Sequence, residues 1–231
     1  MDFFGLQKLT LLDYPGQVAC TVFTGGCNFR CPYCHNGGLV HPGSSPLLSE
    51  EELLAFLKTR TRKLEGITVS GGEPTIHADL PEFLHKVKAL GFLVKLDTNG
   101  QSPKMLRSLF DKGLVDYVAM DIKNCRSRYA ETVGVPGLSI AAIEESVQLL
   151  MNGTIPYEFR TTLCKELHDE TAVSEIGQWL KGCKAYYLQP YRDAPEVLTP
   201  GVYHAPSAEV LEQFRSILLP DIPNVLLRGN E

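Results

Sequence analysis

The sequence predicts an α/β fold, a partial and laterally open barrel built from six β/α units. One observation is the alternation of short apolar segments with amphipathic helical segments along 231 residues. Such alternation is typical of a parallel sheet with right-handed crossovers. A second observation is that six units fall short of the eight that close a barrel. A third is that glycine-rich and polar motifs directly follow the expected strands, where α/β barrels carry their active sites.

The individual elements are predicted from periodicity and from start signals. Ser49 with Glu52 three residues later is a capping box, and Pro103 occupies the favoured first position of a helix. Strands are expected over residues 17–24, 66–70, 92–96, 116–122, 157–163 and 185–189, with a last apolar run at 224–227. Helices are expected from residue 49, over 80–90, from 102, and over 140–151, 171–181 and 207–218.

The domain organisation is predicted to be a single domain over residues 1–231. Residues 1–16 are expected to be an irregular leader or cap that ends in the turn signal Asp13-Tyr14-Pro15-Gly16. Residues 17–190 form the barrel core, and residues 191–231 form a C-terminal helix and tail. No linker, low-complexity tract or charge block divides the chain.

Composition excludes several classes of protein. Apolar residues make up 44% and charged residues 21%, which is ordinary for a globular protein. With 22 basic and 27 acidic residues, the net charge of −5 argues against a large non-specific nucleic-acid surface. Neither a bilayer-spanning apolar run nor a secretion signal is apparent. We therefore expect a cytoplasmic protein with no membrane and no nucleic-acid partner.

Three cysteines in eight residues form the main chemical motif of the chain. Cys27, Cys31 and Cys34 have C-x3-C-x2-C spacing in a loop that glycine pairs flank on both sides. Clustered thiolates suit a soft metal centre. The other cysteines are scattered singly, which suits a reducing compartment and argues against an auxiliary cluster: Cys20, Cys125, Cys164 and Cys183.

The identity of the metal centre depends on the number of ligands. A structural zinc site normally has four, and His35 directly follows Cys34, so it is poorly placed to complete the same tetrahedron. A four-iron cluster can be held by three cysteines, which leaves one iron open for catalysis. The alternatives are a zinc knuckle and three structural core cysteines.

The cysteine motif, with Tyr33 before its third thiol, resembles the signature of the radical S-adenosylmethionine (radical SAM) enzymes. Residues 10–16 and 31–36 together resemble the activating enzymes of glycyl radical enzymes, in particular those of anaerobic ribonucleoside-triphosphate reductases. The resemblance implies a [4Fe–4S] cluster on Cys27, Cys31 and Cys34. It also implies that SAM binds the open iron.

Further cofactor contacts follow from the same resemblance. After the second strand, Gly71, Gly72 and Glu73 match the motif that receives the SAM amino group, although alone they would be a tight turn before a helix. Tyr33, between two cluster ligands, is not expected to pack deeply in the core. The resemblance implies that it lies against the adenine, with His35 and Asn36 on the same edge.

Two adjacent strands end in carboxylates, which repel each other unless a cation lies between them. By resemblance, a monovalent cation (Na⁺ or K⁺) beside the SAM carboxylate is held by Asp97, Thr98, Met120 and Asp121. Asn99 continues the same motif, and Lys123 matches a lysine near the bound nucleoside. Taken alone, these residues could also be a turn and a helix cap.

Two later residues complete the predicted site. The planar guanidinium of Arg160 suits a carboxylate or ribose partner, and a surface ion pair is the equal alternative. Gln189 follows the sixth strand where relatives of the pyruvate formate-lyase activator carry a histidine, so it is the best candidate for the adenosine contact. Surface or core positions are expected for the remaining histidines: His41, His77, His85, His168 and His204.

The resemblance implies that reductive cleavage of SAM yields a 5′-deoxyadenosyl radical, which takes a hydrogen from a glycine of a partner protein. The expected partner is the large subunit of an anaerobic (class III) ribonucleotide reductase, with flavodoxin or ferredoxin as the electron donor. The alternatives are another glycyl radical enzyme, a small-molecule or nucleobase substrate, and a non-catalytic metal-binding adaptor.

Overall fold

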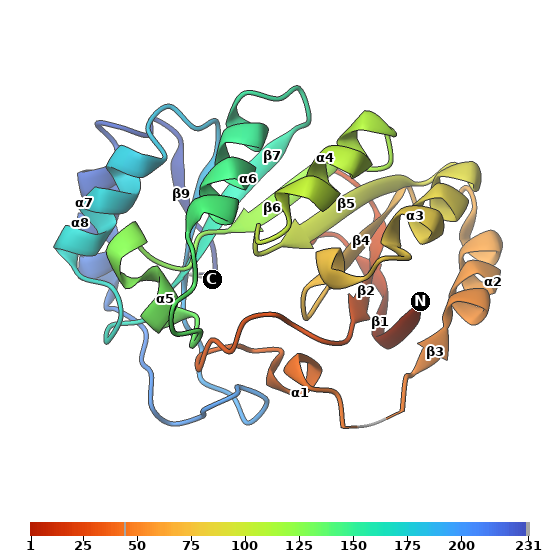
Figure 1. Ribbon diagram of the computed structural model, residues 1–231, viewed down its shortest axis with the longest axis horizontal. Coiled ribbons are helices and arrows are strands. Elements are labelled where there is room, and N and C mark those ends of the chain that lie inside the picture. The colour runs from red at the N-terminus through yellow and green to blue at the C-terminus, as the bar shows by residue number, and fades with distance from the viewer. Residues whose placement is uncertain (44, 230–231) are drawn as a thin grey trace. The chain divides into compact units, whose positions relative to one another are not determined.

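The computed structural model describes residues 1–43 and 45–229, and its contacts divide the chain into two compact units (Figure 1). The first unit contains residues 1–28, 38–119 and 154–156. The second contains residues 29–37, 120–153 and the chain from 157 onward. The last two residues of the expected C-terminal tail, 230–231, lie outside the described residues, as does residue 44.

The first unit is built on a mixed sheet. Its hydrogen-bonded order is β3 (Leu48–Ser49), β1 (Asp2–Thr10), β2 (Ala19–Thr24), β4 (Gly66–Gly71), β5 (Leu93–Thr98) and the start of β6 (Tyr117–Asp121). β1 is antiparallel to both β2 and β3, whereas β2, β4 and β5 run parallel. The parallel strands are buried on both faces, as expected when helices cover a sheet.

Helices of the first unit follow its strands in the expected way. They are α1 (Gly37–Val40, which begins at the unit boundary), α2 (Glu50–Arg60), the 3₁₀ turn η1 (Pro74–Ile76), α3 (Leu80–Ala89) and α4 (Pro103–Asp111). The predicted capping box is present, since the Ser49 side chain accepts from the Glu52 amide and the Glu52 side chain bonds back to Ser49. Phe83 of α3 packs against Phe3 of β1 with 5.0 Å between ring centroids.

The second unit continues from the end of β6 into β7 (Tyr157–Leu163), β8 (Tyr186–Pro190) and β9 (Val225–Leu227), with β7, β8 and β9 parallel. Its helices are η2 (Arg126–Arg128), α5 (Tyr129–Thr132), α6 (Ala141–Met151), α7 (Glu170–Trp179) and α8 (Ala208–Leu218). Helix α7 packs against α8, as Figure 1 shows, and α8 also packs against β8 and β9.

The predicted α/β class, with an open and mainly parallel sheet, is confirmed. Each expected strand is present within a few residues of its predicted limits, and the apolar run at 224–227 is β9. Residues 1–16 differ from the prediction, because Asp2–Thr10 form strand β1 rather than an irregular leader. Register shifts in its pairing with β2 and the exposure of residues 7–9 disrupt the alternation by which a strand is recognised.

The strand ends carry the polar motifs, as the fold class predicts. In the first unit, Cys27 follows β2, Glu73 follows β4 and Asn99 follows β5. In the second unit, Asp121 ends β6, and Gln189 lies near the end of β8. No helix in the described part of the chain has the length and apolar character needed to cross a lipid bilayer.

Candidate active site

Gly71, the last residue of β4, and Gly72 after it lie directly against the start of the cysteine loop. A Cβ on Gly71, which has φ +120°, would lie 2.3 Å from the Thr24 nitrogen, and one on Gly72 would lie 1.9 Å from the Gly26 oxygen. Two backbone hydrogen bonds join the loops here, from the Gly72 amide to Thr24 and from the Glu73 amide to Gly26. The close approach of these two backbone segments therefore requires glycine at both positions, independently of any cofactor.

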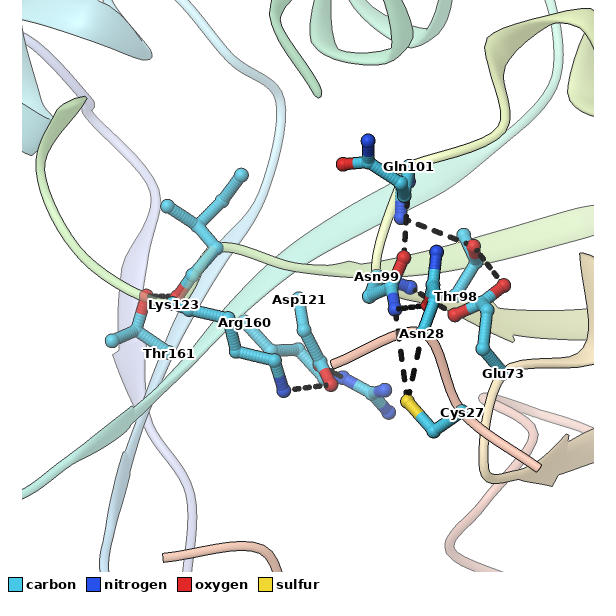
Figure 2. Close-up of polar contacts among 12 residues, drawn as sticks. Cys27, Asn28, Glu73, Thr98, Asn99, Gln101, Asp121, Lys123, Arg160 and Thr161 are labelled. Carbon is cyan, nitrogen blue, oxygen red and sulfur yellow. Dashed lines mark hydrogen bonds and ion pairs between the residues drawn. The ribbon is translucent and has the colours of Figure 1, made fainter. Parts of the chain in front are cut away.

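The Glu73 carboxylate is 1% exposed and is fully engaged within the first unit. It accepts hydrogen bonds from the Thr98 hydroxyl at 2.7 Å and from the Asn99 amide at 2.6 Å (Figure 2). It also accepts from the amide and the hydroxyl of Thr75. Burial raises the pKa of Glu73, whereas these donors favour its ionised form. Glu73 thus ties the loop after β4 to the loop after β5.

Next to the hydrogen bonds of Glu73, the Asn99 side chain extends toward Cys27, the first cysteine of the motif. Its side-chain nitrogen lies 2.8 Å from the Asn28 oxygen and 4.0 Å from the Cys27 sulfur. The nearby Asp97 carboxylate pairs with the almost fully buried Lys95 of the same strand. In the first unit, the structure therefore brings together four of the predicted site residues: Cys27, Glu73, Thr98 and Asn99.

The second unit carries the rest of the cysteine loop. The Cys34 amide donates to the Cys31 oxygen at 3.0 Å, which closes a tight turn. A segment after β8 is bound to this turn, because Leu198 donates to the Cys34 oxygen at 3.0 Å and Thr199 to the Pro32 oxygen at 2.9 Å. We call residues 193–201 the strap. Sequence analysis gave no sign of it, since backbone hydrogen bonds between distant segments leave no residue pattern.

Tyr33 differs from its prediction, because it is 3% exposed and packs edge-on against Tyr203 with 6.2 Å between ring centroids. A loop residue between two thiols is buried because the chain after β8 covers it. Its hydroxyl has no hydrogen-bond partner among the described residues. His35 is anchored separately, with its Nε2 2.6 Å from the Arg192 oxygen.

Asp121, at the end of β6, forms ion pairs with two cationic side chains of the second unit. Its carboxylate lies 2.9 Å from the Arg160 Nε and 2.9 Å from the Lys123 Nζ. Burial opposes ionisation, but the charges of Arg160 and Lys123 hold the pKa of Asp121 well below its usual range. Burial likewise opposes the charge on Lys123, whereas Asp121 and the thiols of Cys31 and Cys34 raise its pKa.

Two buried side chains hydrogen-bond to the backbone of Lys123 and Asp121 and hold that segment in place. His168 is 3% exposed, and its Nε2 donates to the Lys123 oxygen at 3.0 Å. The Tyr129 hydroxyl donates to the backbone oxygen of Asp121 at 3.3 Å. His168 was expected to be surface or core filler, and the structure shows a buried histidine that supports the segment carrying Lys123.

The units divide several predicted groups. Cys27 lies in the first unit and Cys31 and Cys34 in the second, and the pair Asp97 and Thr98 is separated in the same way from Met120 and Asp121. Within the second unit, Gln189 is paired in register with Thr162, and Asn36 follows His35 in the cysteine loop. Sequence reasoning missed the supporting contacts of four residues. Those of Asn28 and His168 are with residues distant in sequence, whereas Thr75 and Lys95 each contact an acidic residue two positions away.

The donor set suits an iron–sulfur cluster with SAM. Three thiols are soft ligands, and burial raises the pKa of the Cys34 thiol while the Lys123 charge opposes that rise. The Tyr33 hydroxyl is buried without a hydrogen-bond partner among the described residues, so a polar group of a ligand that reached it would satisfy it. By their chemistry, these residue types therefore suit the cluster and the SAM that the sequence resemblance implies.

Comparison with known proteins identifies the class. A model of the radical SAM superfamily matches residues 21–174, and the chain belongs to this superfamily. Membership implies a [4Fe–4S] cluster and SAM. A crystal structure of a radical SAM methyltransferase from Sphaerobacter thermophilus has the same fold, with a TM-score of 0.71 and 19% identity over 95% of this chain and 68% of that one.

Within the superfamily, the chain is similar to a protein of Methanocaldococcus jannaschii, MJ1227, which is named as a candidate glycyl-radical enzyme activating enzyme. The two are 33% identical over 191 residues, which cover 81% of this chain and 78% of MJ1227. The chain is also 30% identical over 150 residues to a candidate GTP 3′,8-cyclase of Thermococcus kodakarensis, covering 63% of this chain and 47% of the cyclase. The predicted superfamily and the likeness to its activating-enzyme branch are confirmed, and the chain is an enzyme of the radical SAM class.

Proposed function

We propose that this enzyme activates a glycyl radical enzyme, and that its partner is the large subunit of an anaerobic ribonucleoside-triphosphate reductase. The 33% identity to MJ1227 over four fifths of the chain carries the first part of this proposal. The choice of a reductase as partner is supported by the residue strings 10–16 and 31–36 of the sequence. A cytoplasmic location and a flavodoxin or ferredoxin as electron donor belong to the same proposal.

The cluster and SAM, when bound, supply one-electron cleavage of the sulfonium and a hydrogen-abstracting radical. The protein supplies ligands, orientation and charge. Cys27, Cys31 and Cys34 would hold the cluster, and backbone groups at Gly71 and Gly72 would receive the amino group of SAM. Because Glu73 is saturated by its own chain, its part in that contact is to hold the loop.

In this proposal, residues of the second unit bind the adenosine end of SAM. Tyr33 and Gln189 contact the nucleoside, with His35 and Asn36 beside them. Lys123 and Arg160 outnumber the ionised Asp121, so the three groups together carry a charge of +1. That excess favours an anionic group such as the carboxylate of SAM.

A monovalent cation at Asp97, Thr98, Met120 and Asp121 remains part of the proposal. Each aspartate already has a cationic side chain beside it, Lys95 for Asp97, and Lys123 with Arg160 for Asp121. The cation would have to compete with these partners. SAM cleavage measured in Na⁺, K⁺ and tetramethylammonium buffers tests the site, since a bulky organic cation cannot enter an oxygen cage.

Electron paramagnetic resonance tests the function. The anaerobically reconstituted, reduced enzyme with SAM is expected to produce a glycyl radical signal on a candidate reductase subunit. Cys34→Ser should abolish the signal by removing a cluster ligand. Cys125→Ser is the matched control, because its sulfur contacts the Ser127 hydroxyl at 3.3 Å and a serine can keep that contact. Absence of the signal with every glycyl radical enzyme tried would contradict the proposal.

A small-molecule substrate is the second candidate, and the similarity to the Thermococcus kodakarensis protein favours it. The enzyme would then consume a purine nucleotide and form 5′-deoxyadenosine in equal amounts without any protein partner. Chromatography of reactions with GTP alone separates the two candidates. An activator should instead show substoichiometric or slow SAM cleavage until its partner protein is added.

A further inference from the structure

The side-chain amide of Asn99 has its orientation set by the chain. Asn99 follows β5 and is 5% exposed. The Gln101 backbone amide donates to its Oδ1 at 3.0 Å, and a backbone N–H can only donate, so that atom is the oxygen. The NH₂ group therefore faces Asn28 and Cys27, as Figure 2 shows.

The NH₂ group has two hydrogens and two partners. It lies 2.8 Å from the Asn28 oxygen, which takes one hydrogen, and 4.0 Å from the Cys27 sulfur, toward which the other is directed. The Asn28 oxygen also lies 3.9 Å from that sulfur and can accept only from a protonated thiol. Once Cys27 is a thiolate, Asn99 is the member of this group that can donate to it.

Glu73 fixes the backbone from which Asn99 extends. Its buried carboxylate accepts the Asn99 amide hydrogen at 2.6 Å and the Thr98 hydroxyl at 2.7 Å. The Thr98 hydroxyl oxygen in turn accepts from the Gly100 amide at 3.1 Å. Because one buried carboxylate holds both Thr98 and Asn99, the Asn99 side chain has little freedom to move away from the sulfur.

We propose that Asn99 is a positioning residue that raises the reduction potential of the cluster through the Cys27 sulfur, and that Glu73 holds it there. Reduction adds negative charge to a cluster, and a donor directed at a ligand sulfur stabilises that charge. At 4.0 Å the contact is long, so the effect is that of an oriented dipole in a buried site. The inference rests on the proposed function only for the presence of the cluster, and it needs no partner protein.

Redox titration of the cluster, followed by electron paramagnetic resonance without partner or SAM, tests this. Asn99→Leu keeps the shape of the side chain and removes the amide. Its midpoint potential should become more negative by a three- to tenfold change in the reduction equilibrium, which is about 30–60 mV for one electron. Asn99→Asp, which places an acceptor near the sulfur, should shift the potential further in the same direction.

Asn152→Asp is the matched control, because it makes the same charge change at an exposed amide that donates to Gln148. Glu73→Gln should shift the potential in the same direction as Asn99→Leu but by less, since it removes one of the bonds that hold Asn99. Asn99→Ser decides the matter if the leucine variant does not fold. Loaded variants at Asn99 that all keep the wild-type potential would overturn the proposal. A shifted potential without any glycyl radical would leave it standing and contradict the proposed function instead.

Discussion

At the scale of single residues, His168 makes stability depend on pH. Its Nδ1 accepts from the Cys164 amide at 3.1 Å and its Nε2 donates to the Lys123 oxygen, so the neutral ring is the form that fits. Burial lowers the pKa of His168 from its ordinary value. Since the unfolded chain binds a proton more readily, the stabilisation is complete above the ordinary pKa of roughly 6.5 and is lost as the pH falls below it.

We therefore expect His168→Gln to be less stable than the wild type at pH 7 and to lose less stability between about pH 7 and pH 5. Urea unfolding of the cluster-free protein at several pH values measures both effects. His41→Gln, at an exposed position, is the control and should keep the wild-type pH dependence. Parallel stability curves for the wild type and His168→Gln would show that His168 does not carry this dependence.

Residue identities at the site were predictable where they lie next to one another in sequence. Two motifs can be recognised directly because each lies within one short segment: Cys27, Cys31 and Cys34, and Gly71 to Glu73. What Glu73 touches was not predictable, because Thr98 and Asn99 come 25 and 26 residues later. The same limit explains the burial of Tyr33, which depends on Tyr203 at the far end of the chain.

At the scale of elements, the strap constrains the cysteine loop through one glycine. A Cβ on Gly37 would lie 2.8 Å from both the Glu196 oxygen and the Leu198 nitrogen, so backbone atoms would have to move. We expect Gly37→Ala to displace the strap and to weaken its two hydrogen bonds to Pro32 and Cys34. At about 0.5–1.5 kcal/mol for each bond, the loop would lose roughly 1–3 kcal/mol.

The rate at which a chelator removes iron from the reconstituted enzyme measures this loosening, and it should rise in Gly37→Ala. Gly38→Ala is an adjacent control, since its added Cβ has no atom within 4 Å and should leave the rate unchanged. Equal rates for the two variants would mean that the strap does not support the loop.

A helix or strand could be predicted when the sequence pattern that indicates it lies within its own segment. The β/α repeats have buried strands and capped helices, and each signal lies within its own segment, as at Ser49 and Glu52. Strand β1 was missed because its order comes from pairing with β2 and β3, and because Leu9, at its exposed end, breaks the apolar alternation. A strand that joins a parallel sheet in the antiparallel direction needs no crossover helix, so no helical pattern beside it indicates that it is there.

At the scale of the whole molecule, a cofactor that binds only the folded chain stabilises all of it. SAM at about 100 times its dissociation constant should add about 2.7 kcal/mol to the free energy of unfolding. For a chain of this length, that is a rise in Tm of roughly 5–10 °C. Differential scanning calorimetry of the cluster-loaded enzyme with and without SAM, under anaerobic conditions, measures the shift.

The cluster-free variant Cys27→Ala/Cys31→Ala/Cys34→Ala is the control for this shift. If SAM binds through an open iron, as the superfamily implies, the variant should show little or none of the rise. A full shift in that variant would mean that the polar groups alone bind SAM. Asp121, Lys123 and Arg160 would then be the first residues to replace, because they carry the ionised groups of the second unit's site.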